Sequence, residues 1–194
     1  MRYRGKRSSG IALLLALVAA AVGWFTHTPG HSRRGGVSLP PVQSRSPLAP
    51  GKARVTKIVD GDTIHAMVST ENSAQPADEK IRLYGINAPE LHPRPGQSWS
   101  DFTVQPFAQE ANDFLEKLCP PGTELRITSY GPDRYDRLLA VLILPDGRDV
   151  NKLLVEAGLA RAYFLKTQKN DPLKEEYEHA QYVAQSAGLG IWKK

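Results

Sequence analysis

The sequence has one cysteine, Cys119, and no acidic residue in its first 50 positions. A single cysteine excludes an internal disulfide and a zinc site built from cysteines. Cys119 itself lies in an apolar stretch with helical spacing, and we interpret it as a small buried hydrophobic residue. The chain has 194 residues, 41% of them hydrophobic, which is enough for one domain with an ordinary core and additional segments.

The net charge of +5 is unevenly distributed along the chain. Residues 1–50 hold seven basic residues, whereas the other 18 Lys and Arg are outnumbered by all 20 acidic residues. Residues 51–194 therefore carry a formal charge of −2, and the basic isoelectric point does not indicate a nucleic-acid-binding surface there. Phosphate binding by this part of the chain would need a few placed cations or a metal ion.

The N-terminal segment, residues 1–26, is predicted to be a signal peptide or an N-terminal membrane anchor. A basic start is followed by an unbroken apolar run of 15 residues, 11–25. This run is shorter than the roughly 20 residues of a typical spanning helix, and it includes alanines suited to cleavage. It continues through Phe25, however, so an uncleaved anchor remains open, as does a buried core helix. We expect export to the periplasm or cell exterior, either secreted or tethered through residues 11–25.

Residues 27–52 are rich in Pro, Gly, Ser and Arg and are predicted to form a disordered linker. Residues 53–194 are predicted to form one folded domain. Five segments have the composition of strands, namely 54–59, 63–69, 80–86, 124–130 and 138–144. Three have helical patterns, within 105–122, 149–160 and 171–190, with stop signals at Gly158 and Gly188. This order predicts a small, partly open barrel with helices packed on it.

The segment "VDGDT" contains two acidic residues at the boundary between two predicted strands. Asp60-Gly61 is typical of a tight hairpin turn, and this structural interpretation is sufficient for that pair. Asp62 falls at the start of the returning strand, where an acidic residue is disfavoured unless it is exposed or bound to something. Ca²⁺ would use such a carboxylate, because it collects carboxylate, carbonyl and water oxygens.

Arg82, Glu90 and Arg137 can each be ordinary surface residues or parts of a catalytic site. Arg82 in "IRLYGINAPE" can be an exposed strand residue, and Glu90 can lie in a solvated loop. Arg137 in "DRYDRLLA" immediately precedes an apolar strand. Taken together with Asp62, two guanidinium groups, a metal ligand and a carboxylate are the groups that metal-assisted phosphodiester hydrolysis needs. Arginine binds phosphate oxygens in pairs and keeps its charge at physiological pH.

Six segments now resemble the staphylococcal nuclease (thermonuclease-like) family in order and approximate spacing. They are "VDGDT", "IRLYGINAPE", "QPFAQEA", "DRYDRLLA", "LLVEAGLARAY" and "GLGIW", and they extend over residues 54–192. Together with the N-terminal segment, they suggest a membrane-anchored or secreted bacterial member. The resemblance implies an α+β fold, mainly β: a five-stranded OB-fold barrel with three packed helices. It also implies a Ca²⁺-dependent nuclease acting on DNA and RNA, with 3′-phosphate products, and we expect a monomer.

The resemblance assigns a metal site. Asp62 matches the first metal carboxylate, Asp60 the supporting acid beside it, and Thr63 a residue near the water shell of the metal. Asn87 falls where the family has a second metal carboxylate, and Ala88 where a backbone carbonyl contributes. Asn87 thus removes one negative charge but keeps an oxygen ligand, and we expect weaker Ca²⁺ binding without its loss.

The resemblance also assigns the catalytic residues. Arg82 and Arg137 match two phosphate-clamping arginines, and Glu90 matches the proposed general base. Tyr135 and Tyr163 are candidates for the walls of a nucleotide pocket.

Some positions depart from the family pattern. Asp136 replaces the usual glycine, so the local turn could differ, and Leu165 lies near the expected position of a second pocket tyrosine. The stretch Leu91–Val104 is longer than in the family archetype, and its Trp99 and Phe102 are placed to extend or cover the cleft.

A different class of function stays open. A catalytically weakened OB-fold module of the envelope could bind nucleic acid or a protein, and a tethered structural module would explain the N-terminal segment. The joint presence of Arg82, Glu90 and Arg137 argues against both. The sequence leaves the choice between DNA and RNA open.

Overall fold

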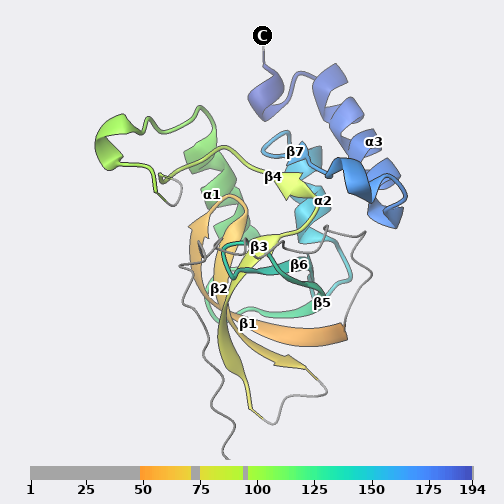
Figure 1. Ribbon diagram of the computed structural model, residues 1–194. Coiled ribbons are helices and arrows are strands. Elements are labelled where there is room, and N and C mark those ends of the chain that lie inside the picture. The colour runs from red at the N-terminus through yellow and green to blue at the C-terminus, as the bar shows by residue number, and fades with distance from the viewer. Residues whose placement is uncertain (1–48, 71–74, 94–95, 194) are drawn as a thin grey trace, which may run out of the picture. The chain divides into compact units, whose positions relative to one another are not determined.

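A computed structural model describes residues 49–70, 75–93 and 96–193, so residues 1–26 and most of the predicted linker lie outside the described residues. Five strands close into a barrel in the order β1-β2-β3-β6-β5 (Figure 1). Their bounds are β1 Ala49–Asp60, β2 Thr63–Thr70, β3 Ala77–Leu83, β5 Glu124–Pro132 and β6 Leu138–Ile143. The predicted five-stranded barrel is confirmed, but it is closed rather than partly open, because β5 pairs with β1.

The barrel mixes antiparallel and parallel pairing. Strands β1, β2 and β3 form an antiparallel meander, and β5 pairs antiparallel with both β6 and β1 to close the barrel. The pair β3–β6 is parallel, with Arg82 opposite Leu139. A parallel pair needs a long crossover, and here it contains α1 and β5. The register places the last residues of β3 beside the first residues of β6, so Arg82 lies close to the start of β6, which Arg137 precedes.

The first strand begins earlier than predicted. Residues 49–52, assigned above to the linker, belong to β1 because all of them pair with β5, and Gly51 and Lys52 also pair with β2. Gly51 lies opposite Thr70 of β2 and Ile127 of β5. The Pro and Gly content that suggested a linker is tolerated, because the neighbouring strands supply the pairing that composition does not favour.

The predicted strand 80–86 is two strands rather than one. β3 ends at Leu83, a turn follows, and β4 (Ile86–Asn87) pairs with β7 (Arg161–Ala162) as a separate two-stranded sheet. The break falls at Gly85, whose φ of 75° lies in the left-handed region that glycine adopts without strain. The turn carries the chain from the barrel to the segment containing Asn87 and Glu90.

The three predicted helices are present: α1 Ala108–Leu118, α2 Val150–Glu156 and α3 Pro172–Ser186. Asp171 caps α3 by accepting a hydrogen bond from Leu173 N at 3.0 Å, and Pro172 takes the first position. Gly158 and Gly188 follow the ends of α2 and α3 with positive φ, as the stop signals predicted. The single-turn 3₁₀ helices are η1 Trp99–Asp101, η2 Lys166–Gln168 and η3 Gly190–Trp192.

Apolar side chains fill the barrel and the space between it and the helices. Ile64, Ile81 and Leu142 from three strands are fully buried, as are Leu115 of α1 and Leu154 of α2. Cys119 is also buried in this core, in agreement with the sequence interpretation. Among the described residues, none of the helices has both the length and the apolar character needed to cross a membrane.

A buried asparagine joins α2 to the barrel next to the β3 turn. Asn151 has no exposed surface, and its Nδ2 donates to the carbonyl oxygens of Tyr84 at 2.9 Å and Ala140 at 3.1 Å. Its Oδ1 accepts from Leu142 N at 3.2 Å. Because buried backbone groups are costly to leave unpaired, this single side chain fixes the end of β3 against β6 and α2.

Candidate functional site

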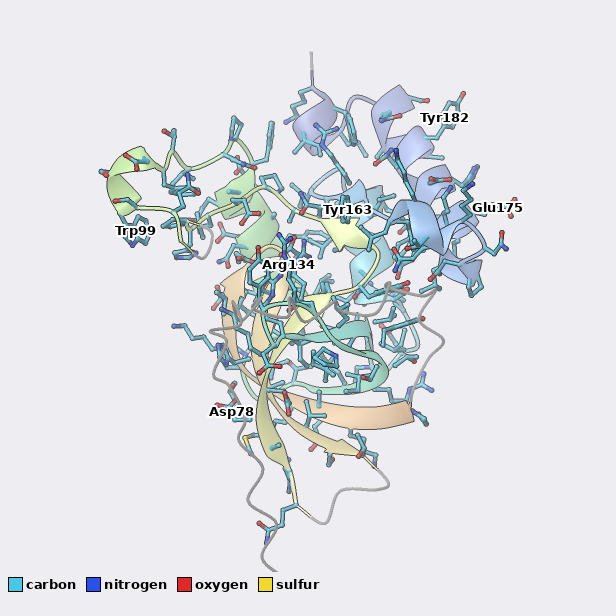
Figure 2. All side chains as sticks on the ribbon, viewed as in Figure 1. Asp78, Trp99, Arg134, Tyr163, Glu175 and Tyr182 are labelled. Atoms are coloured by element: carbon cyan, nitrogen blue, oxygen red, sulfur yellow. The ribbon has the colours of Figure 1, made fainter. Side chains whose placement is uncertain are left out.

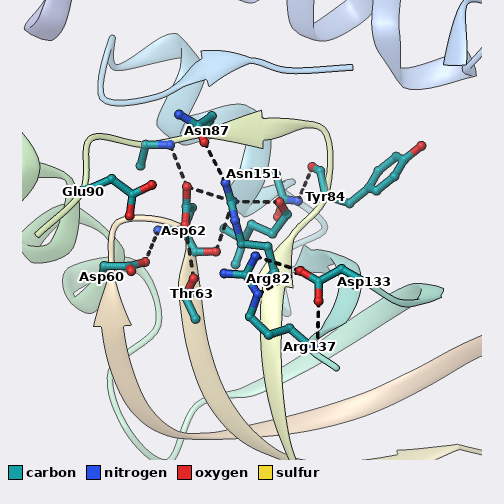
Figure 3. A network of polar contacts seen from close by, with 12 residues as sticks. Asp60, Asp62, Thr63, Arg82, Tyr84, Asn87, Glu90, Asp133, Arg137 and Asn151 are labelled. Atoms are coloured by element: carbon teal, nitrogen blue, oxygen red, sulfur yellow. Dashed lines mark hydrogen bonds and ion pairs between the residues drawn. The ribbon is translucent and has the colours of Figure 1, made fainter. Parts of the chain in front are cut away.

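The β1–β2 hairpin holds Asp62 at one end of the barrel (Figure 3). Asp62 N donates to Asp60 Oδ1 at 3.2 Å, and Thr63 Oγ1 donates to Asp62 Oδ1 at 3.2 Å. Gly61 is required at the turn, because a Cβ there would lie 2.6 Å from the Cβ of Ala111 in α1 and 2.9 Å from that of Ala88. The hairpin reading of this motif is correct, and the same turn also buries the Asp62 carboxylate.

Arg82 bridges the two oxygens that the sequence assigned to the metal. Its Nη1 lies 2.8 Å from Asp62 Oδ2, and its Nη2 donates to Asn87 Oδ1 at 3.0 Å (Figure 3). Nη1 also donates to the carbonyl oxygen of Leu83 at 3.2 Å. The Arg82 side chain is only 12% exposed. The carboxylate of Asp62 and the amide oxygen of Asn87 therefore converge on one positive centre.

Burial dominates the ionisation of Asp62. Loss of water raises the pKa of this carboxyl well above its ordinary value, and the nearby charges of Asp60 and Glu90 raise it further. The Arg82 guanidinium and the Ala88 N–H act in the opposite direction. The negative charges of this site thus interact with one another, which is the electrostatic situation that a bound cation relieves.

The backbone N–H of Ala88 contacts Asp62, whereas the sequence analysis had assigned the Ala88 carbonyl to the metal. Its N–H donates to Asp62 Oδ2 at 2.7 Å, and the residue is buried. This bond locks the strand segment of Asn87 onto the hairpin. A contribution of the Ala88 carbonyl to a metal stays a prediction.

Glu90 is anchored by a residue that the sequence analysis did not single out. Glu90 N donates to Gln105 Oε1 at 3.0 Å, and Gln105 N donates to the Glu90 carbonyl at 3.1 Å. Figure 3 shows the Glu90 carboxylate near the hairpin, and its negative charge helps to raise the pKa of Asp62. Gln105 stands in the motif "QPFAQEA", but only the fold brings it to Glu90.

Arg137 is held by Asp133, a second residue that sequence reasoning missed. Asp133 Oδ2 accepts from Arg137 Nε at 2.9 Å and lies 2.7 Å from Nη2, while Oδ1 accepts from the N–H groups of Arg137 and Tyr135. Asp136, which replaces a glycine of the family pattern, has a φ of 64°. Asp tolerates this left-handed conformation better than most residues, so the tight turn forms without glycine.

The two arginines come from neighbouring strands, because β3 and β6 are paired and Arg137 immediately precedes β6. Tyr135 lies with Arg137, whose guanidinium carbon is 5.5 Å from the ring centroid. Tyr163 is exposed after β7, and its N–H donates to the Gly85 carbonyl at 2.8 Å. Tyr163 is therefore attached to the turn between β3 and β4 (Figure 2).

The donor set at Asp62 suits a hard cation. Within residues 49–70, 75–93 and 96–193, no three His, Cys, Asp or Glu side chains are placed to hold a metal ion together. Asp62 and Asn87 nevertheless direct a carboxylate oxygen and an amide oxygen toward the same guanidinium group, and both are oxygen types that Ca²⁺ accepts. The residues present therefore fit such an ion, with Arg82 supplying the local positive charge in this structure.

A closed five-stranded barrel with three helices, and an arginine paired with a buried carboxylate, is the architecture expected from the sequence resemblance. A family model described as "Staphylococcal nuclease homologue" matches residues 80–194. The match includes more than half of the chain, and the chain belongs to this family.

Three relatives illustrate the range of similar proteins. The chain is 31% identical over 156 residues to Endonuclease YhcR of Bacillus subtilis strain 168, which is 78% of this chain and 12% of that protein. It is 34% identical over 139 residues to an uncharacterized endonuclease of Haemophilus influenzae, 72% of this chain and 65% of that protein. It is 33% identical over 120 residues to probable endonuclease LCL3 of Coccidioides posadasii, 58% of this chain and 36% of that protein. The chain thus spans less than two thirds of the length of each of these relatives.

Proposed function

We propose that this protein is a Ca²⁺-dependent nuclease that hydrolyses internal phosphodiester bonds of DNA or RNA and leaves 3′-phosphate ends. The observation that carries the proposal is the convergence of Asp62 and Asn87 on Arg82, with Glu90 close enough to affect Asp62. Arg137 immediately precedes β6, the strand paired with β3. Family membership and the endonuclease names of the relatives support the same reaction class.

In this proposal Asp62 and Asn87 hold the Ca²⁺ ion, together with the carbonyl of Ala88, while Asp60 and Thr63 support Asp62. When bound, the ion supplies positive charge for a phosphate oxygen. Thr63 Oγ1 already donates to the Asp62 carboxylate, so its role is to fix the orientation of that group. Asp60 accepts from the backbone N–H of Asp62, so its role is to fix the turn that carries Asp62.

The chain's own residues perform the remaining steps. Glu90 accepts a proton from the attacking water at a carboxylate oxygen, while the water oxygen bonds to phosphorus. Arg82 and Arg137 donate hydrogen bonds to phosphate oxygens and stabilise the charge that grows there, which is usually the largest catalytic effect. The bond from phosphorus to the 5′-oxygen breaks, and this oxygen takes a proton from solvent. Tyr135 and Tyr163 are proposed to flank the nucleotide.

One observation favours a second candidate, a weakened module that binds nucleic acid or protein without cleaving it. Arg82 is largely buried and its donors are engaged by Asp62, Asn87 and a backbone carbonyl. An arginine in this state must give up or share contacts before it binds a phosphate. Digestion of DNA and RNA by the purified chain, with Ca²⁺ and with a chelator, separates the two candidates.

Export and the monomeric state are also proposals. Export is supported by the basic start and the apolar run of residues 11–25, and fractionation together with reporter fusions tests it. Finding the protein in the cytoplasm, with fusions inactive outside the cell, would contradict the proposed export. Light scattering of the purified protein tests the monomeric state.

A further inference from the structure

Trp99 is a large aromatic residue that the barrel does not use. It begins η1 in the segment between β4 and α1, and 66% of its surface is exposed (Figure 2). Tryptophan is usually well buried, because it has more apolar surface to remove from water than most residues. Single exposed aromatic residues occur on most protein surfaces, so exposure alone does not assign a role to Trp99, and its surroundings decide.

Neighbouring groups fix the orientation of the Trp99 ring. His92 and Phe102 both contact it edge to face, with ring centroids at 5.9 Å and 6.0 Å. Ser98 caps the short helix through a hydrogen bond from Ser100 N, and Gln97 Nε2 donates to the Asp101 carbonyl at 3.1 Å. The ring is thus held in place while most of it faces solvent, so a flat ligand would bind without first ordering the side chain.

The Trp99 segment begins and ends at the candidate site. The two hydrogen bonds between Glu90 and Gln105 close its base, at 3.0 Å and 3.1 Å. Glu90 is the proposed general base, and the described residues 99–105 lead from Trp99 to Gln105, which is bonded to Glu90. This continuity favours a ligand that is long enough to reach both places.

We propose that Trp99 is a stacking platform for an unpaired base of a single-stranded nucleic acid whose backbone enters the site at Glu90. This inference rests on the proposed function, because the same strand supplies the phosphodiester. Stacking on an aromatic ring requires the free face of a base, which a strand exposes and a duplex hides between its base pairs. Trp99 would therefore favour single strands and act outside the reacting groups.

The polar setting of Trp99 distinguishes this ligand from a lipid surface. The residues beside the ring along the chain are Gln97, Ser98, Ser100 and Asp101, all exposed. A membrane-inserting aromatic would be expected among further exposed apolar side chains, since burial in lipid scales with apolar area. Val104 of the same segment is also exposed, but one aliphatic side chain adds little apolar area, and an aromatic face among polar residues suits a base better.

Binding tests the inference without relying on turnover. In a Glu90→Gln background, fluorescence anisotropy would measure the affinity for a labelled oligothymidylate of about twelve nucleotides and for a duplex of the same length. Loss of one stacked base corresponds to roughly a 5- to 150-fold weaker affinity, so Trp99→Ala should lose that much for the single strand and much less for the duplex. Trp99→Phe should retain most of the affinity.

Tyr182 provides a matched control. It is equally exposed, at 66%, but lies in α3, and Tyr182→Ala should leave both affinities unchanged. Trp99→Ala binding the single strand as tightly as its parent, or losing both forms equally, would overturn the inference. So would a loss confined to binding of phosphatidylcholine–phosphatidylglycerol vesicles, which would identify a lipid surface instead.

The two proposals fail in different ways. A parent chain that digests DNA while the Trp99→Ala affinity is unchanged leaves the nuclease standing and removes the stacking platform. A parent chain that binds the single strand through Trp99 but never cleaves it keeps the platform and removes the nuclease. If the Glu90→Gln protein binds no oligonucleotide at all, the stacking platform is wrong.

Discussion

Arg82 Nη2 donates to Asn87 Oδ1 at 3.0 Å, so the amide that replaces a family carboxylate is the acceptor of an arginine. The same guanidinium pairs with Asp62 at 2.8 Å. With an amide at position 87, the site has one carboxylate facing the guanidinium, and its negative charge is lower than it would be with two carboxylates. The affinity of the site for a divalent ion should reflect that difference.

Replacing Asn87 by Asp should lower the Ca²⁺ concentration for half-maximal activity by about tenfold, with a smaller change in rate at saturation. The reason is that an added carboxylate strengthens the attraction of the site for the ion. This shift would be measured by following activity as Ca²⁺ is added and by calorimetric titration of Ca²⁺ binding. The control is Asn170→Asp at an exposed position. Identical titration curves for Asn87→Asp and the parent would show that Asn87 is not a ligand.

Removing the proposed base should affect the rate rather than the fold. Glu90→Gln is expected to lower turnover about 10²- to 10⁴-fold, the usual range for general-base catalysis. Initial rates on DNA would measure this, and the surface variant Glu124→Gln is the control, because Glu124 pairs with Arg54 at an exposed position. A Glu90→Gln enzyme as fast as the Glu124→Gln control would place the base elsewhere.

The two arginines should differ in their effect on stability. Arg137→Ala and Arg82→Ala should each lower turnover at least about 10²-fold, because each removes a phosphate contact. Arg82→Ala should also destabilise the fold, by about 3 kcal/mol, since it leaves the buried Asp62 without its partner. Urea unfolding compared with the exposed control Arg148→Ala would show the difference, and equal stability of all three variants would refute a structural role for Arg82.

Asp133 should make the stability of the protein pH-dependent. Burial alone would raise its pKa, but hydrogen bonds from Arg137 and Tyr135 outweigh burial and hold the pKa below its ordinary value of 3.8. A depressed folded-state pKa contributes stability above about 3.8, which is lost as pH falls through the folded value.

The replacement Asp133→Asn should therefore cost about 1 kcal/mol near pH 7, allowing for the partial solvent exposure of the pair, and almost nothing near pH 2. Urea unfolding of both proteins across this range would measure the difference. A cost that does not depend on pH would contradict this prediction. Asp133→Asn should also lower turnover, because Arg137 loses the group that positions it.

The local parts of the fold were predictable because each rests on neighbouring residues. Asp60-Gly61 predicted the hairpin, and Asp171 with Pro172 predicted the start of α3. The end of β3 at Leu83 was missed, because "KIRLYGI" keeps a strand pattern through the turn. The pairing of Asn87 with Arg161 of β7, which makes β4 a separate strand, depends on residues far apart in the chain.

In the candidate site, too, contacts between residues close in sequence were predictable, and contacts between distant residues were not. The resemblance identified its charged residues, but not their mutual contacts. The Asp133–Arg137 pair had a local signal that could have been found, because an aspartate in a turn accepts hydrogen bonds from backbone N–H groups a few residues later, which keeps Arg137 close to it. The Gln105–Glu90 pair had none, because a segment of intervening chain separates the two residues and only its closure brings them together.

The most direct test of the nuclease account is the cleavage of single-stranded DNA by the purified full chain, followed as Ca²⁺ is added, removed with a chelator and restored. The account predicts cleavage with added Ca²⁺, arrest on chelation, recovery when Ca²⁺ is returned, and products ending in 3′-phosphate. Cleavage that persists in the chelator would contradict the proposed metal site. No cleavage at any Ca²⁺ concentration, in a protein that still binds the strand, would contradict the nuclease itself.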